Sequence, residues 1–383
     1  MKHIYLDYAA TTPVDKRVLK EMLPYFAEKF GNSMSLHSFG QEAKLALETS
    51  REILADIINA KANEIIFTSS ATESNNTVLK GVAFANRNKG NHIIISSIEH
   101  PCIIESAKWL EKQGFEITRL SVDKFGMVNP EDVKNAIKEN TILVSVMHAN
   151  NEIGTIQPIV EIGKICHEKG ILFHTDASQS FGKIPIDVEK MNIDLLTASS
   201  QKIYGPKGAG LLYVKSGIIL TPLLHGGGQE NGFRGSTVNV AGIVGFAKAA
   251  EICKKEMKKE GKRQTALRNY LIKEVLKIKN SRLNGHPTKR LPNNANFSFN
   301  FVEGESLLMQ LDMEGIACST GSACSSFKLE PSHVLLAIGL KPEQAHGSLR
   351  VSLGRFTTKK DIEKIIKILP GIVEKIRAIS PYK

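Results

Sequence analysis

Two charged residues at the ends of apolar runs are the first candidates for covalent chemistry. Lys202 follows the apolar run 195–198, with hydroxyl groups before it and a Gly-Pro turn after it. A desolvated lysine in such a position can form a Schiff base with a carbonyl compound. Asp176 ends another apolar run, and a carboxylate there must be hydrogen-bonded or paired, because burying it alone is unfavourable. Asp176 could cap the next helix, or it could hold a positively charged ring nitrogen.

A cluster of small hydroxylic residues occupies positions 69–76, between an apolar run and a helical pattern. Such a turn directs backbone N–H groups and hydroxyls at an anion, typically a phosphate. The same residue types are typical of a plain helix N-cap. On this segment alone, both interpretations stay open.

A thiol in a Gly/Ser-rich segment is the third candidate. Cys324 lies within residues 317–326, where small residues favour mobility, so its thiol could reach into a cleft and swing out again. Buried cysteines normally have apolar neighbours, which Cys324 lacks. The other cysteines are interpreted as structural: Cys102, Cys166, Cys253 and Cys318.

These candidates must be positioned by the elements around them. Between residues 64 and 214, short β-branched runs alternate with helical patterns, and the predicted strands are 65–68, 92–96, 141–147, 171–175, 195–198 and 210–214. Several runs lack in/out alternation, as expected of strands that helices bury on both faces. The pattern predicts an α/β fold with a mostly parallel sheet. The polar clusters follow its strands, where such sheets bind ligands.

The remainder of the chain predicts a smaller α+β unit. Residues 240–277 have helical periodicity without proline, and they are followed by predicted strands 296–301 and 348–353 and predicted helices 304–313, 332–340 and 358–379. We expect a large α/β domain over residues 12–255. The small domain is expected to comprise residues 1–11 and 256–383.

Composition excludes several classes of protein. The chain has 383 residues, of which 42% are hydrophobic and 23% charged, so it is neither a fibre nor a disordered tail. Its net charge of +11 is compatible with an anionic partner, but the densest basic stretch, 254–268, is interleaved with acids and is interpreted as an exposed helix face. No uncharged stretch approaches the roughly 20 apolar residues that span a bilayer. The five cysteines contain no CxxC pair, which favours a reducing cytoplasm over a disulfide framework.

Common nucleotide and zinc-protease motifs are absent. The sequence has no GxGxxG, no GxxxxGK[ST] and no HExxH. It resembles instead the class V, fold-type I family that uses pyridoxal 5′-phosphate, and within it the cysteine desulfurases of the NifS and IscS type. The segments that carry this resemblance, in chain order, are 5–12, 31–32, 71–76, 150–154, 199–208, 225–230, 321–324 and 350–355.

The resemblance implies a role for each site residue. Lys202 would bond to the cofactor, Asp176 would pair with its ring nitrogen, and His100 would stack on the ring and transfer protons. Gln179 would hydrogen-bond the ring hydroxyl, and Asn151 and Arg350 would hold the substrate carboxylate. The phosphate would be bound by Ala71, Thr72, Ser199 and Gln201, with Thr237 contributed by the partner subunit of a homodimer.

The implied reaction removes sulfur from L-cysteine and releases L-alanine. The thiolate of Cys324 would take the sulfur as a persulfide and carry it to an acceptor, such as an iron–sulfur scaffold protein. No intrinsic metal is implied, and a transient contact of Cys324 with a [2Fe-2S] cluster on a scaffold stays open. The resemblance also implies a fold-type I architecture with a seven-stranded sheet.

One residue departs from the family pattern. The family usually has histidine before the Schiff-base lysine, whereas this chain has Gln201, for which we expect a penalty of about 1 kcal/mol in cofactor binding. The longer segment from Cys324 to Pro331 favours delivery of sulfur to a scaffold over selenocysteine lyase activity. The alternatives are a selenocysteine lyase, another class V aminotransferase or a basic binding protein without activity. No aromatic stacking platform accompanies the charge, which disfavours nucleic acid as a partner.

Overall fold

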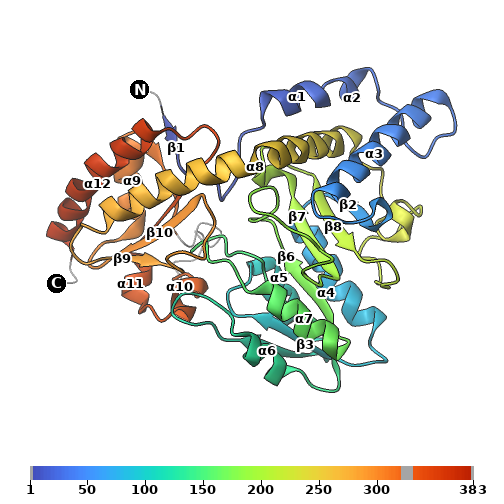
Figure 1. The fold of residues 1–383 in the computed structure, drawn as a ribbon, viewed down its shortest axis with the longest axis horizontal. Helices are drawn as coiled ribbons and strands as arrows, with labels where there is room; N and C mark the ends of the chain where they lie inside the picture. Colours follow the sequence, from blue (N-terminus) through green and yellow to red (C-terminus); the bar gives the residue numbers. More distant parts are fainter. Residues whose placement is uncertain (1–2, 321–330, 381–383) are drawn as a thin grey trace.

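The computed structural model describes residues 3–320 and 331–380. Its main element is a seven-stranded sheet of order β2-β8-β7-β6-β5-β3-β4 (Figure 1). The strands are β2 (Ile65–Thr68), β3 (His92–Ser96), β4 (Glu116–Leu120), β5 (Thr141–Ser145), β6 (Leu172–Asp176), β7 (Leu195–Ser199) and β8 (Gly210–Val214). Strand β8 runs in the opposite direction to the other six strands, so the sheet is mostly parallel, as predicted.

Both faces of this sheet are buried. One face packs on α4 (Ala71–Ala85) and α5 (Pro101–Glu111), and the other on α3 (Ser38–Asp56), α7 (Ile159–Lys169) and the first half of α8 (Val240–Val275). Successive residues of β3 therefore enter opposite cores, which explains why the apolar runs lack alternation. The edge strand β4 was not predicted from the pattern, because Glu116 and Arg119 are exposed and only Leu120 is buried.

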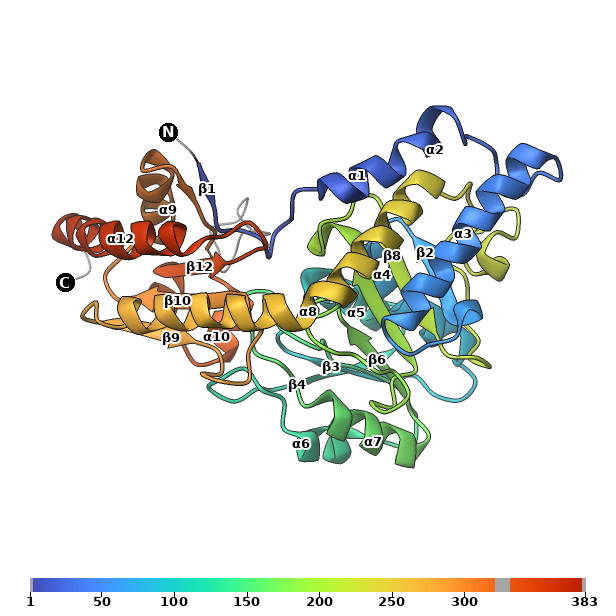
Figure 2. The same ribbon diagram turned by 45° about the horizontal axis from the view of Figure 1, so that its top comes forward.

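The C-terminal part of the chain forms a second sheet and core. Its strands are β9 (Ser281–Asn284), β10 (Asn294–Phe299) and β12 (Ser348–Ser352), antiparallel in the order β12-β10-β9. The short strands β1 (Ile4–Tyr5) and β11 (Ile316–Ala317) pair in parallel beside it. The second half of α8 covers this core together with α9 (Gly304–Met313) and α12 (Lys359–Ile379), as Figure 2 shows.

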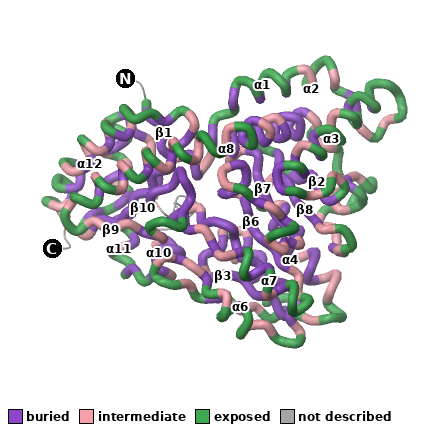
Figure 3. Tube along the Cα trace, in the orientation of Figure 1, coloured by how far each residue is buried: buried purple, intermediate pink, exposed green. Residues whose placement is uncertain are grey.

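Shorter helices complete the described chain. They are α1 (Lys16–Met22), α2 (Pro24–Ala27), α6 (Pro130–Ala136), α10 (His333–Ala337) and α11 (Pro342–His346). Figure 3 shows buried backbone concentrated in the two sheets and exposed positions on the outer helices. Within residues 3–320 and 331–380, no helix combines the length and the apolar character that crossing a bilayer requires.

The helix α8 connects the two cores without a break. It contributes Phe246 and Ile252 to the first core and Leu271 and Val275 to the second. The predicted domain boundary near residue 255 falls inside this helix, and the division into two domains stays a prediction.

The basic stretch 254–268 on α8 is only partly an exposed face. Lysines such as Lys254 and Lys258 are exposed, as expected. Arg268 is buried, however, and donates hydrogen bonds to the carbonyl oxygens of Leu291 at 2.6 Å and Arg290 at 3.3 Å. The prediction was wrong for Arg268 because the charge count does not reveal which arginine finds backbone acceptors.

Candidate active site

A cavity of about 230 Å³ lies at the carboxyl ends of β2, β3, β5, β6 and β7. Parallel strands bring their following loops to one edge of a sheet, so segments distant in sequence meet there. The cavity is lined by ten of the predicted site residues: Ala71, Thr72, His100, Asn151, Asp176, Gln179, Ser199, Gln201, Lys202 and Arg350. The structure therefore brings together nearly the whole predicted set.

Lys202 lies on a 3₁₀ turn, Ser200–Lys202, that directly follows β7. Its Nζ donates hydrogen bonds to the carbonyl oxygens of Ala9 at 2.8 Å and Ala10 at 2.6 Å. The N-terminal segment also binds this turn through Thr12, whose N–H and hydroxyl both donate to the carbonyl oxygen of Gln201. Lys202 thus lines the cavity, and its amine contacts two backbone carbonyl groups of the N-terminal segment.

Asp176 is the last residue of β6 and is buried at the cavity wall. Its carboxylate accepts hydrogen bonds from Asn75 Nδ2 at 2.7 Å and from the backbone N–H of Ser178 at 2.8 Å. Among the residues that the structure describes, no cation forms an ion pair with it. A buried carboxylate without a cationic partner can accept a hydrogen bond from the protonated nitrogen of a cationic ring.

The hydroxylic cluster caps a helix, and it also lies at the cavity. Ser70 caps α4 by accepting a hydrogen bond from the N–H of Glu73 at 3.2 Å. Ala71 and Thr72 occupy the first turn of the helix and line the cavity. The first-turn N–H groups and the helix dipole make this end of the cavity suitable for a phosphate.

His100 caps α5 at the edge of the cavity, next to Pro101 at the first helical position. Its Nδ1 accepts a hydrogen bond from the N–H of Cys102 at 3.2 Å. Burial lowers the pKa of His100, and nearby Lys202 lowers it further, against the opposing effect of Asp176. The neutral ring with its proton on Nε2 is therefore the favoured form near pH 7.

Arg350 reaches the cavity from β12 and is 4% exposed. Its Nη2 lies 2.8 Å from Asp7 Oδ1, and its Nη1 donates to the carbonyl oxygen of Asn151 at 3.3 Å. Gln179, on the opposite wall, donates from Nε2 to the carbonyl oxygen of Ala9 at 2.9 Å and accepts from Lys183 at 3.3 Å. Since the carbonyl oxygen of Ala9 can only accept, Nε2 must face it, and the amide oxygen of Gln179 faces Lys183.

Two predicted residues do not lie in the described cavity. Thr237 is exposed and lines neither this cavity nor its rim; its predicted contact belongs to the partner subunit. Cys324 lies outside the described residues. The other four cysteines are free thiols, and burial raises the pKa of Cys102, at the cavity wall, to about 12. Cys102 is thus protonated at neutral pH, which is consistent with a structural role.

Some cavity residues were not predicted. Asn75 binds Asp176 although it lies on another element, and the carbonyl groups of Ala9 and Ala10 bind Lys202. The position of Asn75 on the first turns of α4, four residues after Ala71, is a signal that could have identified it. Backbone acceptors give no such signal in a sequence.

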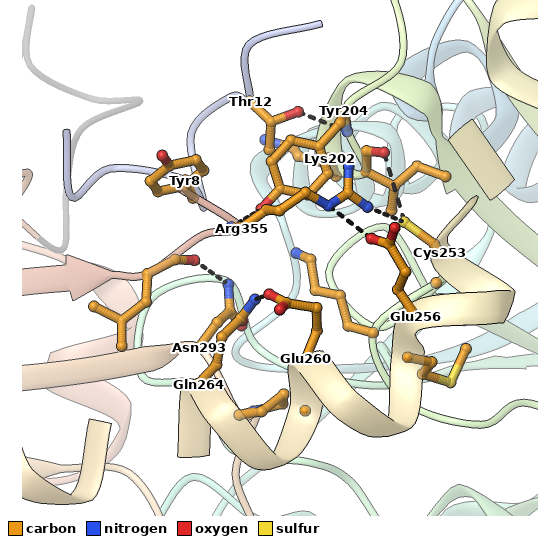
Figure 4. A pocket seen from close by; sticks show the side chains of 17 residues that line it. Tyr8, Thr12, Lys202, Tyr204, Cys253, Glu256, Glu260, Gln264, Asn293 and Arg355 are labelled. Carbon is orange, nitrogen blue, oxygen red and sulfur yellow. Dashed lines mark hydrogen bonds and ion pairs between the residues drawn. The ribbon is translucent and has the colours of Figure 1, made fainter. Parts of the chain in front are cut away.

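A second pocket, of about 40 Å³, shares Lys202 with the cavity and is also lined by Tyr204 and Arg355 (Figure 4). Arg355 crosses it, with Nη1 at 2.6 Å from Asp15 and Nε at 3.0 Å from Glu256. The guanidinium also stacks on the Tyr204 ring at 4.3 Å. Arg17 contacts the same two acids, so the charges of these two arginines and two acids balance one another.

Comparison with known proteins places this arrangement in a family. The family model for class-V aminotransferases matches residues 4–365. The chain belongs to the class-V aminotransferase family. Among its curated relatives is a cysteine desulfurase IscS from Dictyoglomus turgidum, 56% identical over 383 residues, which are 100% of this chain and 97% of that protein. Another, from Methanosarcina thermophila, is 53% identical over 380 residues, 99% of this chain and 94% of that protein.

Solved structures agree with this membership of the class-V aminotransferase family. A NifS-like protein superimposes with a TM-score of 0.92 at 38% identity, covering 97% of this chain and all of that chain. A structure described as SspA in complex with cysteine has a TM-score of 0.82 at 39% identity, with 93% and 100% coverage. The predicted fold and the predicted NifS/IscS resemblance are both confirmed.

The cofactor of this family is pyridoxal 5′-phosphate, and the cavity fits it. The cavity offers the N-terminus of α4, the carboxylate of Asp176, which forms no ion pair within residues 3–320 and 331–380, and Lys202 on the turn after β7. These are an anion site, a partner for a cationic ring nitrogen and an amine for a Schiff base.

Proposed function

We propose that this protein is a pyridoxal-phosphate-dependent cysteine desulfurase, which converts L-cysteine to L-alanine and forms a persulfide on Cys324. The observation that carries the proposal is that Lys202, Asp176, His100 and Arg350 meet in one cavity of a chain 56% identical to a cysteine desulfurase. When bound, the cofactor supplies an electron-withdrawing ring that stabilises negative charge on the substrate carbons.

The residues of the chain then have separate tasks. Asp176 keeps the proton on the ring nitrogen, and its bonds from Asn75 and Ser178 fix the carboxylate for that purpose. His100 moves protons through Nε2, because its Nδ1 is occupied by the N–H of Cys102. Lys202 would hold the cofactor covalently through its amine.

Substrate and phosphate are bound at the two ends of the cavity. Arg350 and Asn151 bind the carboxylate of L-cysteine, for which a guanidinium fork is suited. Ala71, Thr72 and Ser199 bind the phosphate, and Gln201 adds a neutral donor where the family usually has histidine. Gln179 orients the ring hydroxyl, with its amide direction set by the carbonyl oxygen of Ala9.

The sulfur step transfers one sulfur atom from L-cysteine to Cys324. The thiolate of Cys324 forms a bond to the sulfur of L-cysteine while the bond between that sulfur and Cβ breaks. The electron pair of the broken bond stays on carbon, which takes a proton and becomes the methyl group of L-alanine. Cys324 then carries the persulfide to an acceptor such as an iron–sulfur scaffold protein.

The active unit is proposed to be a homodimer with Thr237 completing the partner's phosphate site. Support comes from large apolar side chains exposed on α1, α2 and the residues that follow them: Leu19, Leu23, Phe26, Phe30, Met34 and Leu36. Such a patch favours burial against a second copy. A reducing cytoplasm is the proposed location, consistent with four free thiols among the described cysteines.

A single substitution tests the proposed reaction. Cys324→Ser should keep the absorbance of the bound cofactor while abolishing sulfide and alanine production from L-cysteine in the presence of a reductant. Cys253→Ser is the matched control, because this buried thiol lies outside the cofactor cavity, and it should retain activity. Alanine and sulfide formation by Cys324→Ser at the parental rate would contradict the proposal and favour another class V activity.

A further inference from the structure

Asp7, in the N-terminal segment, forms an ion pair with the guanidinium of Arg350, which lines the cavity. Asp7 Oδ1 lies 2.8 Å from Arg350 Nη2, and the two side chains are 18% and 4% exposed. Arg350 lines the cavity, whereas Asp7 lies behind it. Charge pairs that are shielded from water in this way interact more strongly than surface pairs.

The guanidinium keeps a free donor in spite of this contact. Asp7 accepts from Nη2 and the carbonyl oxygen of Asn151 accepts from Nη1. No residue within 3–320 or 331–380 accepts a hydrogen bond from the buried Nε. The guanidinium has five N–H donors, and these contacts use one on Nη1 and one on Nη2, so an incoming carboxylate meets further donors on a cation whose charge Asp7 balances.

Asp7 is fixed in its position by backbone contacts with β12. It forms a bridge with Ser352, and the next two residues donate to Ser352, from Tyr8 N–H to the carbonyl oxygen and from Ala9 N–H to Oγ. The hydroxyl of Tyr5 donates to the carbonyl oxygen of Asp7 at 3.0 Å. These contacts fix the backbone of Asp7 beside β12, next to Arg350.

A second acid near Arg350 does not take over this role. Glu152 is fully buried, and burial raises its pKa to about 7, against the lowering effects of Ser332 and Arg350. Its Oε2 accepts a hydrogen bond from the hydroxyl of Ser332 at 2.5 Å. Within the described chain, the carboxylate in direct contact with the Arg350 guanidinium is that of Asp7.

We propose that Asp7 is a positioning residue that holds Arg350 in place and weakens the binding of amino-acid carboxylates, so that the product can leave. Two carboxylates that share one guanidinium repel each other, which opposes the gain from the new hydrogen bonds. The proposal rests on the proposed role of Arg350 as the carboxylate-binding residue.

The test compares two ligands that differ only in the carboxylate. Asp7→Asn keeps the shape and a hydrogen-bond acceptor but removes the charge. With the holoenzyme, the dissociation constants of L-alanine and L-alaninamide are measured from competition with L-cysteine. We expect L-alanine to bind about tenfold more tightly to Asp7→Asn than to the parent. The uncharged amide should bind equally to both, and the KM for L-cysteine should fall without a rise in kcat.

Asp15→Asn is the matched control, since it removes a carboxylate from the same N-terminal segment. Asp15 pairs with Arg17 and Arg355 rather than with Arg350, so neither dissociation constant should change. An unchanged or weaker affinity of Asp7→Asn for L-alanine would overturn the inference, and so would an equal change for both ligands. A parent enzyme that does not distinguish L-alanine from L-alaninamide would overturn the role of Arg350 itself.

Discussion

The two pockets that share Lys202 hold charge differently. On the second-pocket side, Arg355 forms ion pairs with Asp15 and Glu256, so the fold compensates these charges. On the cavity side, Arg350 is likewise paired with Asp7, but Asp176 accepts hydrogen bonds from an amide and an N–H group and forms no ion pair within residues 3–320 and 331–380. Charges compensated within the fold stabilise it, whereas charges held by neutral groups are available to a ligand.

The largest expected effect tests the cavity side of this comparison. Asp176→Asn keeps hydrogen bonding but removes the charge that pairs with the ring nitrogen. We expect kcat/KM for L-cysteine to fall by a factor of about 10² to 10³, which corresponds to about 3–4 kcal/mol of lost stabilisation. Steady-state alanine production measures this loss.

The matched control for that prediction lies at the opposite end of the sheet. Asp194 precedes β7 and is ion-paired with Lys215 at 3.0 Å, so Asp194→Asn should stay within about threefold of the parental kcat/KM. Near-parental turnover by Asp176→Asn would break the comparison, because the uncompensated charge would then have no function.

The next effect tests the second-pocket side. Arg355→Ala removes two ion pairs and the contact with the Tyr204 ring, and Arg355 is 13% exposed. We expect the free energy of unfolding in urea to fall by about 3 kcal/mol, because buried charges lose their partner. The exposed pair Arg119–Glu111 gives a control, since Arg119→Ala should lower the free energy of unfolding by less than about 1 kcal/mol.

Activity separates a structural Arg355 from a catalytic one. Folded Arg355→Ala should retain kcat/KM within about threefold of the parent, below the temperature at which it unfolds. A loss of activity comparable to that of Asp176→Asn, with unchanged stability, would show that the second pocket is not merely structural.

The smallest effect concerns Glu99, directly before His100. Glu99 is fully buried, and burial raises its pKa to about 8 despite hydrogen bonds from Ser96 and Met147. A carboxyl whose pKa is raised by folding stabilises the fold fully below its unfolded pKa, and this stabilisation is lost as the pH rises through the folded value. Because its pKa is about 8, the Glu99 carboxyl is mostly neutral at pH 7.

Glu99→Gln removes this pH dependence. The free energy of unfolding of the variant, relative to that of the parent, should increase by about 2 kcal/mol between pH 6 and pH 8. Urea titrations at the two pH values measure it, and other titrating groups cancel in the difference. A constant difference would mean that Glu99 is charged over this pH range, so that a buried carboxylate lies directly before His100.

Much of the fold could be predicted because the strands are buried on both faces. The β-branched runs gave β2, β3 and β8 with their observed bounds, and strand ends then implied where Asp176 and Lys202 meet. The edge strand β4 was missed because its exposed residues carry no apolar pattern. A local apolar pattern therefore identifies a strand when both of its faces are buried, and not when the strand is exposed at the edge of the sheet.

Contacts between distant segments could not be predicted in the same way. The pairing of Asp7 with Arg350 and the carbonyl groups that bind Lys202 depend on how the N-terminal segment crosses β12. Likewise, the burial of Arg268 depends on backbone acceptors near residue 290. Residue types alone do not specify such contacts.

The most direct test of the account is to locate the lysine that holds the cofactor. Borohydride reduction of the holoenzyme, followed by peptide mass mapping, should place a single pyridoxyl group on Lys202. Lys183 is the internal control, because burial lowers its pKa to about 7 and it lies behind Gln179, away from the cavity lining. A pyridoxyl group on Lys183, or on no lysine at all, would contradict the account.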